Sequence, residues 1–65
     1  MNEYQIIISI NGVFLFRTEW DSNLDRVKQA ISNLKQLYEI NETANVNIKV
    51  YKKDSSMVDI ANELL

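Results

Sequence analysis

The chain has 65 residues, no Cys, no His, seven basic and nine acidic residues, and a formal net charge of −2. This length leaves room for one domain, residues 1–65, and the missing Cys and His exclude disulfides and the usual zinc sites. The charge disfavours a dedicated duplex-DNA-binding protein, because such proteins carry a basic surface.

The N-terminal part of the chain predicts a β-hairpin that is apolar on both faces. Two runs of β-branched and aromatic residues, 3–10 and 13–19, flank Asn11-Gly12, the dipeptide most typical of a tight type I′ turn. Because side chains alternate along a strand, one face is expected to carry Ile6, Ile8, Ile10, Val13, Leu15 and Arg17. The other face is expected to carry Ile7, Ser9, Phe14, Phe16 and Trp20.

The next segment predicts a long amphipathic helix over residues 24–39. Apolar side chains recur at three- and four-residue spacings, at Leu24, Val27, Ala30, Ile31, Leu34, Leu37 and Tyr38. Ser22 with Asp25 three residues later resembles a capping box, and Asp21 is an alternative cap. Residues 41–45 are predicted to form a polar loop.

The C-terminal third predicts a strand followed by a short helix. Residues 46–52 alternate, with Val46, Ile48 and Val50 expected inward and Asn47, Lys49 and Tyr51 outward. Ser56, with Asp59 three residues later, is typical of a helix start. A second amphipathic stripe then follows, at Met57, Ile60, Ala61 and Leu64.

These elements predict an α+β fold of the order ββαβα, with a three-stranded sheet, one long helix on one face and a short C-terminal helix. The long helix connects the second and third strands, so these two strands should run parallel and their crossover should be right-handed. We favour the strand order 2-1-3, and the alternative places the third strand beside the second.

One long helix covers one sheet face, so the second apolar face is the predicted site of function. The predicted partner-binding residues are Ile7, Phe14, Phe16, Trp20 and Tyr51. Three occupants compete for this face: the C-terminal helix, a second copy of the chain, or a different protein. A homodimer is favoured, because so small a core usually needs a further source of stability.

The same face has an alternative interpretation, a platform for single-stranded nucleic acid. Its aromatic rings could stack on bases, with Lys49, Lys52 and Lys53 near the phosphates. The net negative charge of the chain argues against this interpretation, since phosphate contacts dominate such binding.

No motif predicts catalysis, so we expect no enzyme, no metal and no cofactor. Small size, the absence of Pro, and richness in Asn, Ile and Lys are typical of phage and mobile-element accessory proteins. The predicted function is a non-enzymatic protein-interaction module that inhibits a bacterial complex, for example a defence or nuclease complex, by steric occlusion. The alternative is a small nucleic-acid-binding or transcription-regulating protein. A soluble, cytoplasmic protein is expected, because residues 1–3 lack a basic start and no long apolar run occurs.

Overall fold

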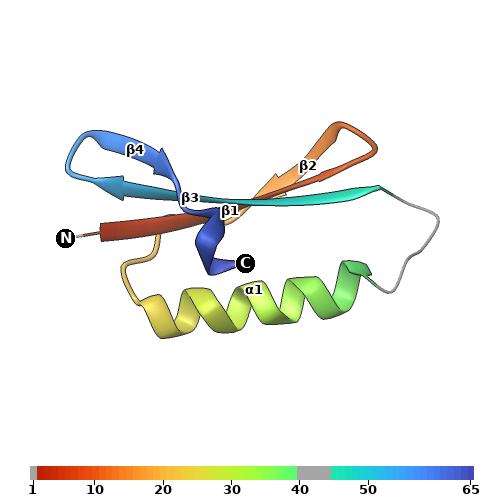
Figure 1. Cartoon of the computed structure of the whole chain (residues 1–65), viewed down its shortest axis with the longest axis horizontal. Coiled ribbons are helices and arrows are strands. Elements are labelled where there is room, and N and C mark those ends of the chain that lie inside the picture. The colour runs from red at the N-terminus through yellow and green to blue at the C-terminus, as the bar shows by residue number, and fades with distance from the viewer. Residues whose placement is uncertain (1, 40–44) are drawn as a thin grey trace.

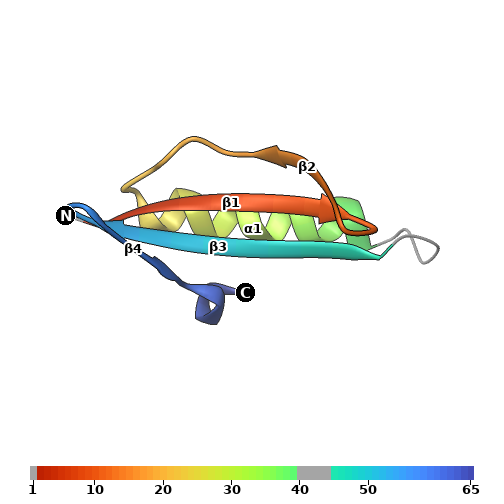
Figure 2. The same ribbon diagram turned by 90° about the horizontal axis from the view of Figure 1, so that it is seen from above.

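The computed structural model describes residues 2–39 and 45–65 and shows an α+β fold built on one four-stranded antiparallel sheet (Figure 1). The elements, in chain order, are β1 (Asn2–Ile10), β2 (Val13–Arg17), α1 (Leu24–Glu39), β3 (Val46–Asp54), β4 (Met57–Ile60) and a short 3-10 helix, η1 (Asn62–Leu64). The strand order is β2-β1-β3-β4, and α1 lies behind β1 and β3 when the sheet is seen from above (Figure 2). The predicted order 2-1-3 is therefore part of the observed sheet, which β4 extends beyond β3.

A tight turn at Asn11-Gly12 joins β1 to β2, as the sequence predicts. Both residues have positive φ, 52° and 80°, which a type I′ turn requires. The backbone N–H of Asn11 donates to the Asn45 carbonyl at 2.8 Å, and the Asn11 side-chain oxygen accepts from the Asn45 N–H at 3.0 Å. The turn therefore also holds the start of β3. The predicted polar loop, apart from Asn45, lies outside the described residues.

A β-bulge in β2 changes the predicted register of the hairpin. Ser9 pairs with Phe14, but Ile8 pairs with Phe16, so Leu15 is the extra residue on β2. A bulge places two residues of one strand opposite one residue of its partner, and a one-residue shift exchanges the two faces of a strand.

The predicted faces of Phe16 and Arg17 are consequently wrong. Phe16 lies on the side of α1, where its ring centroid is 6.4 Å from that of Tyr38. Arg17 pairs with Ile7 and lies on the side away from α1. The hydrophobic cluster around α1 thereby gains an aromatic ring, and the opposite face gains a cation.

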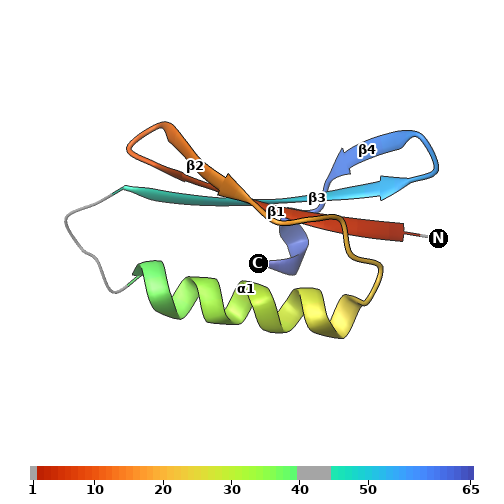
Figure 3. The same ribbon diagram turned by 180° about the vertical axis from the view of Figure 1, so that it is seen from behind.

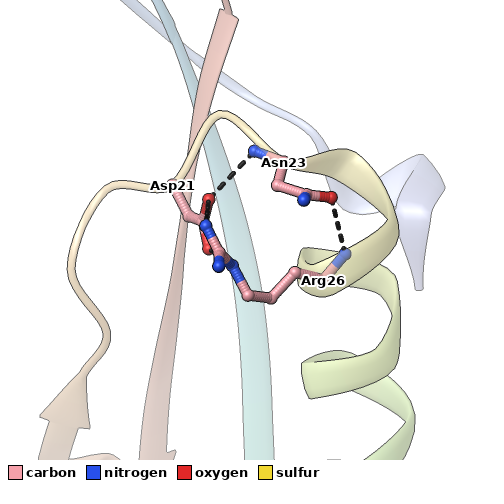
Figure 4. A network of polar contacts seen from close by, with 3 residues as sticks. All are labelled: Asp21, Asn23 and Arg26. Carbon is pink, nitrogen blue, oxygen red and sulfur yellow. Dashed lines mark hydrogen bonds and ion pairs between the residues drawn. The ribbon is translucent and has the colours of Figure 1, made fainter.

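The long helix begins and ends at the predicted residues, 24–39. Its cap is Asn23, not Ser22 or Asp21 (Figure 4). The Asn23 side-chain oxygen accepts from the Arg26 N–H at 3.1 Å, and the Asn23 carbonyl accepts from the Val27 N–H at 3.0 Å. Asn23 directly precedes the first helical residue, the position from which a side chain reaches the free N–H groups of the first turn. Within residues 2–39 and 45–65, no helix has the length and apolar character needed to cross a membrane.

The predicted C-terminal helix is wrong, and the order ββαβα becomes ββαββ followed by one 3-10 turn. Ser55, with a φ of 56°, and Ser56 form a two-residue turn, after which β4 returns antiparallel to β3. A helix of nine residues is marginal in water, whereas a strand at this position forms main-chain hydrogen bonds with β3. Tertiary pairing therefore overrides the weak helical periodicity.

The core cluster lies on the α1 side of the sheet. Its buried members are Ile6, Ile8, Val27, Ile31, Val50 and Ala61. After β4, the Ala61 N–H donates to the Val50 carbonyl at 2.8 Å, and the Asn62 side-chain oxygen accepts from the Val50 N–H at 3.1 Å. The C-terminal segment therefore covers the α1 side of the sheet (Figure 1), not the face for which its predicted helix was a candidate cover.

Candidate partner-binding face

The sheet face turned away from α1 is called the open face. The tips of both hairpins rise on this side of the molecule, as the two side views show (Figures 1 and 3). Strand alternation and pairing divide the open face into four rows that cross the strands. From the start of β1, these rows are Glu3, Lys53 and Val58; Gln5, Tyr51 and Ile60; Arg17, Ile7 and Lys49; and Phe14, Ser9 and Asn47.

Apolar side chains occupy both ends of the open face. Phe14 is 59% exposed at one end, and Val58 and Ile60 are 52% and 63% exposed at the other. Ile7 and Tyr51 are half-buried between them. Exposed apolar side chains therefore lie at both ends of this face, and large groups of exposed apolar side chains are typical of interaction sites.

Trp20 lies at the end of the open face where β1 begins. The Lys53 Nζ is 4.7 Å from the centroid of the Trp20 ring and 3.8 Å from a carboxylate oxygen of Glu3. Cation–π contacts of this kind contribute about 0.5–1 kcal/mol at exposed sites. Trp20 therefore belongs to the open face and is not part of the core cluster.

The open face is more basic than the chain as a whole. Its four rows carry the cations Arg17, Lys49 and Lys53 and the carboxylate of Glu3, whereas the chain has a net charge of −2. Glu19 lies at the margin of the face, where it lines a shallow pocket with Arg17 and Trp20. Arg17 and Lys49 flank Ile7 in the third row and are exposed. The centre of the open face is thus cationic, between two apolar ends.

The structure brings together most of the predicted site residues and separates two. Ile7, Phe14, Trp20 and Tyr51 share the open face, as predicted. Phe16 lies on the α1 side because of the bulge. Lys49 and Lys53 share the open face, whereas Lys52 pairs with Tyr4 and Asp59 on the other side of the sheet.

Three residues of the open face are not predicted from the sequence. Strand alternation places Arg17 on the other face, because alternation alone gives no sign of a bulge. The apolar spacing places Val58 and Ile60 in a helix. Two features of the sequence indicate a strand here. Ser55-Ser56 can form a two-residue turn after the alternating strand, and Asp59 then separates Val58 from Ile60, which is a strand-like alternation.

A polar network at the start of α1 ties this helix to the edge of β1 (Figure 4). Asp21 and Tyr4 exchange main-chain hydrogen bonds of 2.8 and 2.9 Å. The Asp21 carboxylate accepts from Arg26 Nε at 2.6 Å, from Arg26 Nη2 at 3.0 Å and from the Asn23 N–H at 2.9 Å. The hydrogen bonds from Arg26, and then that from Asn23, hold the pKa of Asp21 below its ordinary value, and the same pair raises the pKa of Arg26.

This network predicts an acid-dependent loss of stability. The pKa of Asp21 is lower in the folded chain than in the unfolded chain, where it is 3.8. The contribution of Asp21 to the stability of the fold is therefore complete above pH 3.8 and is lost as the pH falls through the pKa of the folded chain. As the pH drops below 3.8, we expect the melting temperature of the wild type to fall more steeply than that of Asp21→Asn. Thermal unfolding followed by circular dichroism measures this difference. Arg26→Gln should also make the melting temperature less dependent on pH. If the melting temperature of both variants depends on pH as steeply as that of the wild type, the Asp21–Arg26 pair is not the cause of the acid sensitivity.

A scan against protein-family models, a search of curated proteins and a search of solved structures find no match to this chain.

Proposed function

We propose that this chain is a non-enzymatic protein-interaction module that binds a partner protein through the open face of its sheet. The observation that carries the proposal is the exposure of Phe14, Val58 and Ile60, each more than half exposed on this face. Among the described residues, α1 and the C-terminal segment both lie on the other side. Burial of apolar surface favours association by about 25 cal/mol per Å² before the costs of binding are subtracted.

The charges of the open face indicate what kind of partner surface it can bind. Arg17 and Lys49 at its centre fit a surface with carboxylates among apolar groups, because complementary charge steers association and selects partners. A face-to-face homodimer would bring these cations near their own copies, which is unfavourable. The open face therefore has two candidate partners, the second copy expected from the small core and a different, acidic protein. The charges of the face favour the acidic protein.

Occupation of a partner's surface is the mode of action we propose. A chain of 65 residues is large enough to cover a standard interface patch of about 800 Å². Its composition, typical of phage and mobile-element accessory proteins, supports a cytoplasmic inhibitor that occludes a bacterial defence or nuclease complex.

Binding of single-stranded nucleic acid is the second candidate. Lys49, two residues before Tyr51 on β3, and Arg17, in the same row as Lys49, support it, since a sheet with aromatic rings and cations is a known platform for bases. Lys52 lies on the other side of the sheet, and the aliphatic side chains Val58 and Ile60 offer no stacking surface. These observations make a protein partner the better-supported candidate.

The test compares Phe14→Ser with Leu37→Ser, a matched control that removes an apolar side chain 66% exposed on α1. Phe14→Ser should reduce capture of the partner from a bacterial lysate at least tenfold, while wild type and Leu37→Ser capture the same protein equally. Light scattering over a concentration series shows whether that partner is a second copy. Equal capture by Phe14→Ser would refute the proposal, and capture lost after nuclease treatment would favour the nucleic-acid function.

A further inference from the structure

We propose that the free edge of β4 is a second binding element, which pairs with an extended segment of a partner protein as a fifth strand of the sheet. The inference rests on the proposed function in one respect, that the partner is a protein. It uses the main chain of β4, whereas the proposed function uses side chains of the open face, so separate variants test the two.

The main-chain groups of Val58 and Ile60 point away from β3. The Ala61 N–H donates to the Val50 carbonyl, and hydrogen-bonded and non-hydrogen-bonded pairs alternate along an antiparallel ladder. The neighbouring pair, Tyr51 with Ile60, is therefore non-hydrogen-bonded, and so is Lys53 with Val58. Outside this ladder, no described residue forms a main-chain hydrogen bond with Val58 or Ile60.

The two edges of the sheet differ in their protection against strand pairing. The β2 edge carries the bulge at Leu15, and bulges interrupt the regular row of groups that an added strand needs. The β4 edge has a regular register, no Pro, and one charged residue, Asp59. All four residues of β4 are exposed, including Met57 at 67%. The β4 edge is thus the one open to an added strand.

The position of Asp59 argues against a second copy as the added strand. Two-fold pairing centred on Asp59 would use the free groups of Val58 and Ile60 of both copies, but it would set two Asp59 side chains directly opposite each other. Pairing centred on Val58 avoids this repulsion, but its outer hydrogen bonds then fall on Ser56 in the turn. A foreign segment is subject to neither limit.

The pairing geometry at the β4 edge also predicts which side chains the foreign segment should carry. Its central side chain lies opposite Asp59, on the α1 side of the sheet, where Lys52 is the cross-strand neighbour of Asp59. A Lys or Arg there would continue an alternation of charge across the strands. Its two flanking side chains lie beside Val58 and Ile60, which are 52% and 63% exposed, and are therefore apolar. The fitting segment is extended and reads apolar, basic, apolar.

The experiment titrates a capped pentapeptide, Thr-Val-Lys-Val-Thr, into the ¹⁵N-labelled full chain at low salt and follows the amide signals by NMR. The amides of Val58 and Ile60 should shift downfield as they gain hydrogen bonds. Two control peptides test the mode of binding: one has both Val nitrogens methylated, and the other has Glu in place of Lys. Both should bind at least about tenfold more weakly than the parent peptide.

Val58→Pro blocks the edge without removing a β3–β4 hydrogen bond, because the Val58 N–H points outward and Pro is tolerated at such positions. It should weaken peptide binding at least about tenfold, whereas Val58→Thr should not. Asp59→Asn serves as a second variant that leaves the main chain intact, and it should abolish the preference for the Lys peptide over the Glu peptide.

Each of the following results would overturn the proposal: no peptide binding by wild type, equal binding of the methylated peptide, undiminished binding by Val58→Pro, an unchanged Lys preference in Asp59→Asn, or a wild-type dimer that Val58→Pro converts to a monomer. Phe14→Ser should leave peptide binding unchanged. If Phe14→Ser loses partner capture but the wild type does not bind the peptide, the proposed β4 site is wrong. The proposed function of the open face would still be supported.

Discussion

Phe16→Ala is expected to lower the free energy of unfolding by about 2–3 kcal/mol, less than the cost for a fully buried Phe, while Phe14→Ala changes it by less than about 1 kcal/mol. The difference follows from the bulge. Phe16 lies against the core cluster with its ring near Tyr38, whereas Phe14 is 59% exposed on the open face. Urea denaturation followed by circular dichroism measures both values.

The two variants form a matched pair, because each removes the same side chain from the same strand. A regular hairpin without the bulge would place both rings on one face, and both variants would then lose similar amounts of stability. Similar losses would therefore contradict the observed pairing of Ile8 with Phe16. Leu15→Ala, at a residue 46% exposed, should cost less than Phe16→Ala.

Ile8→Ala is expected to unfold most of the protein at 25 °C. Ile8 is fully buried, at 0% exposure, and truncation of such a residue costs about 2–5 kcal/mol. A single core in a chain this small rarely supplies more than about 3–5 kcal/mol in total. The loss is thus comparable with the whole stability of the domain.

Ile7→Ala is the control for Ile8→Ala, since Ile7 is the same residue type one position earlier and lies half-buried on the open face. We expect a loss of about 1 kcal/mol, with a folded far-UV spectrum and a cooperative urea transition. A folded Ile8→Ala variant with a loss as small as that of Ile7→Ala would show that the α1 side of the sheet is not the core.

Local signals were sufficient for much of the fold. Asn11-Gly12 supports positive φ at both central turn positions, and the apolar spacing of residues 24–39 matches one helical face, so both elements could be predicted. The alternation in β3 likewise predicted which residues share the open face, including Lys49 and Tyr51. Each of these features depends on neighbours in the sequence.

The bulge could not be predicted, because Leu15 and Phe16 are both apolar and either can face the core without an obvious penalty. The C-terminal segment was ambiguous for a related reason: an apolar run as short as Met57–Ile60 fits a period of two as well as a period of 3.6. Met57–Ile60 forms a strand because it pairs with the available edge of β3, and local periodicity gives no information on that contact.

The sequence by itself determined the absence of Cys and His from this chain, a hairpin, a helix, a third strand and a surplus of apolar residues. Only the tertiary structure decided which side chains form the candidate site. It moved Phe16 to the core side and placed Arg17, Val58 and Ile60 on the open face. The physical reason is that strand alternation relates residues only within a regular strand, so one bulge and one long-range strand pairing reassign whole faces.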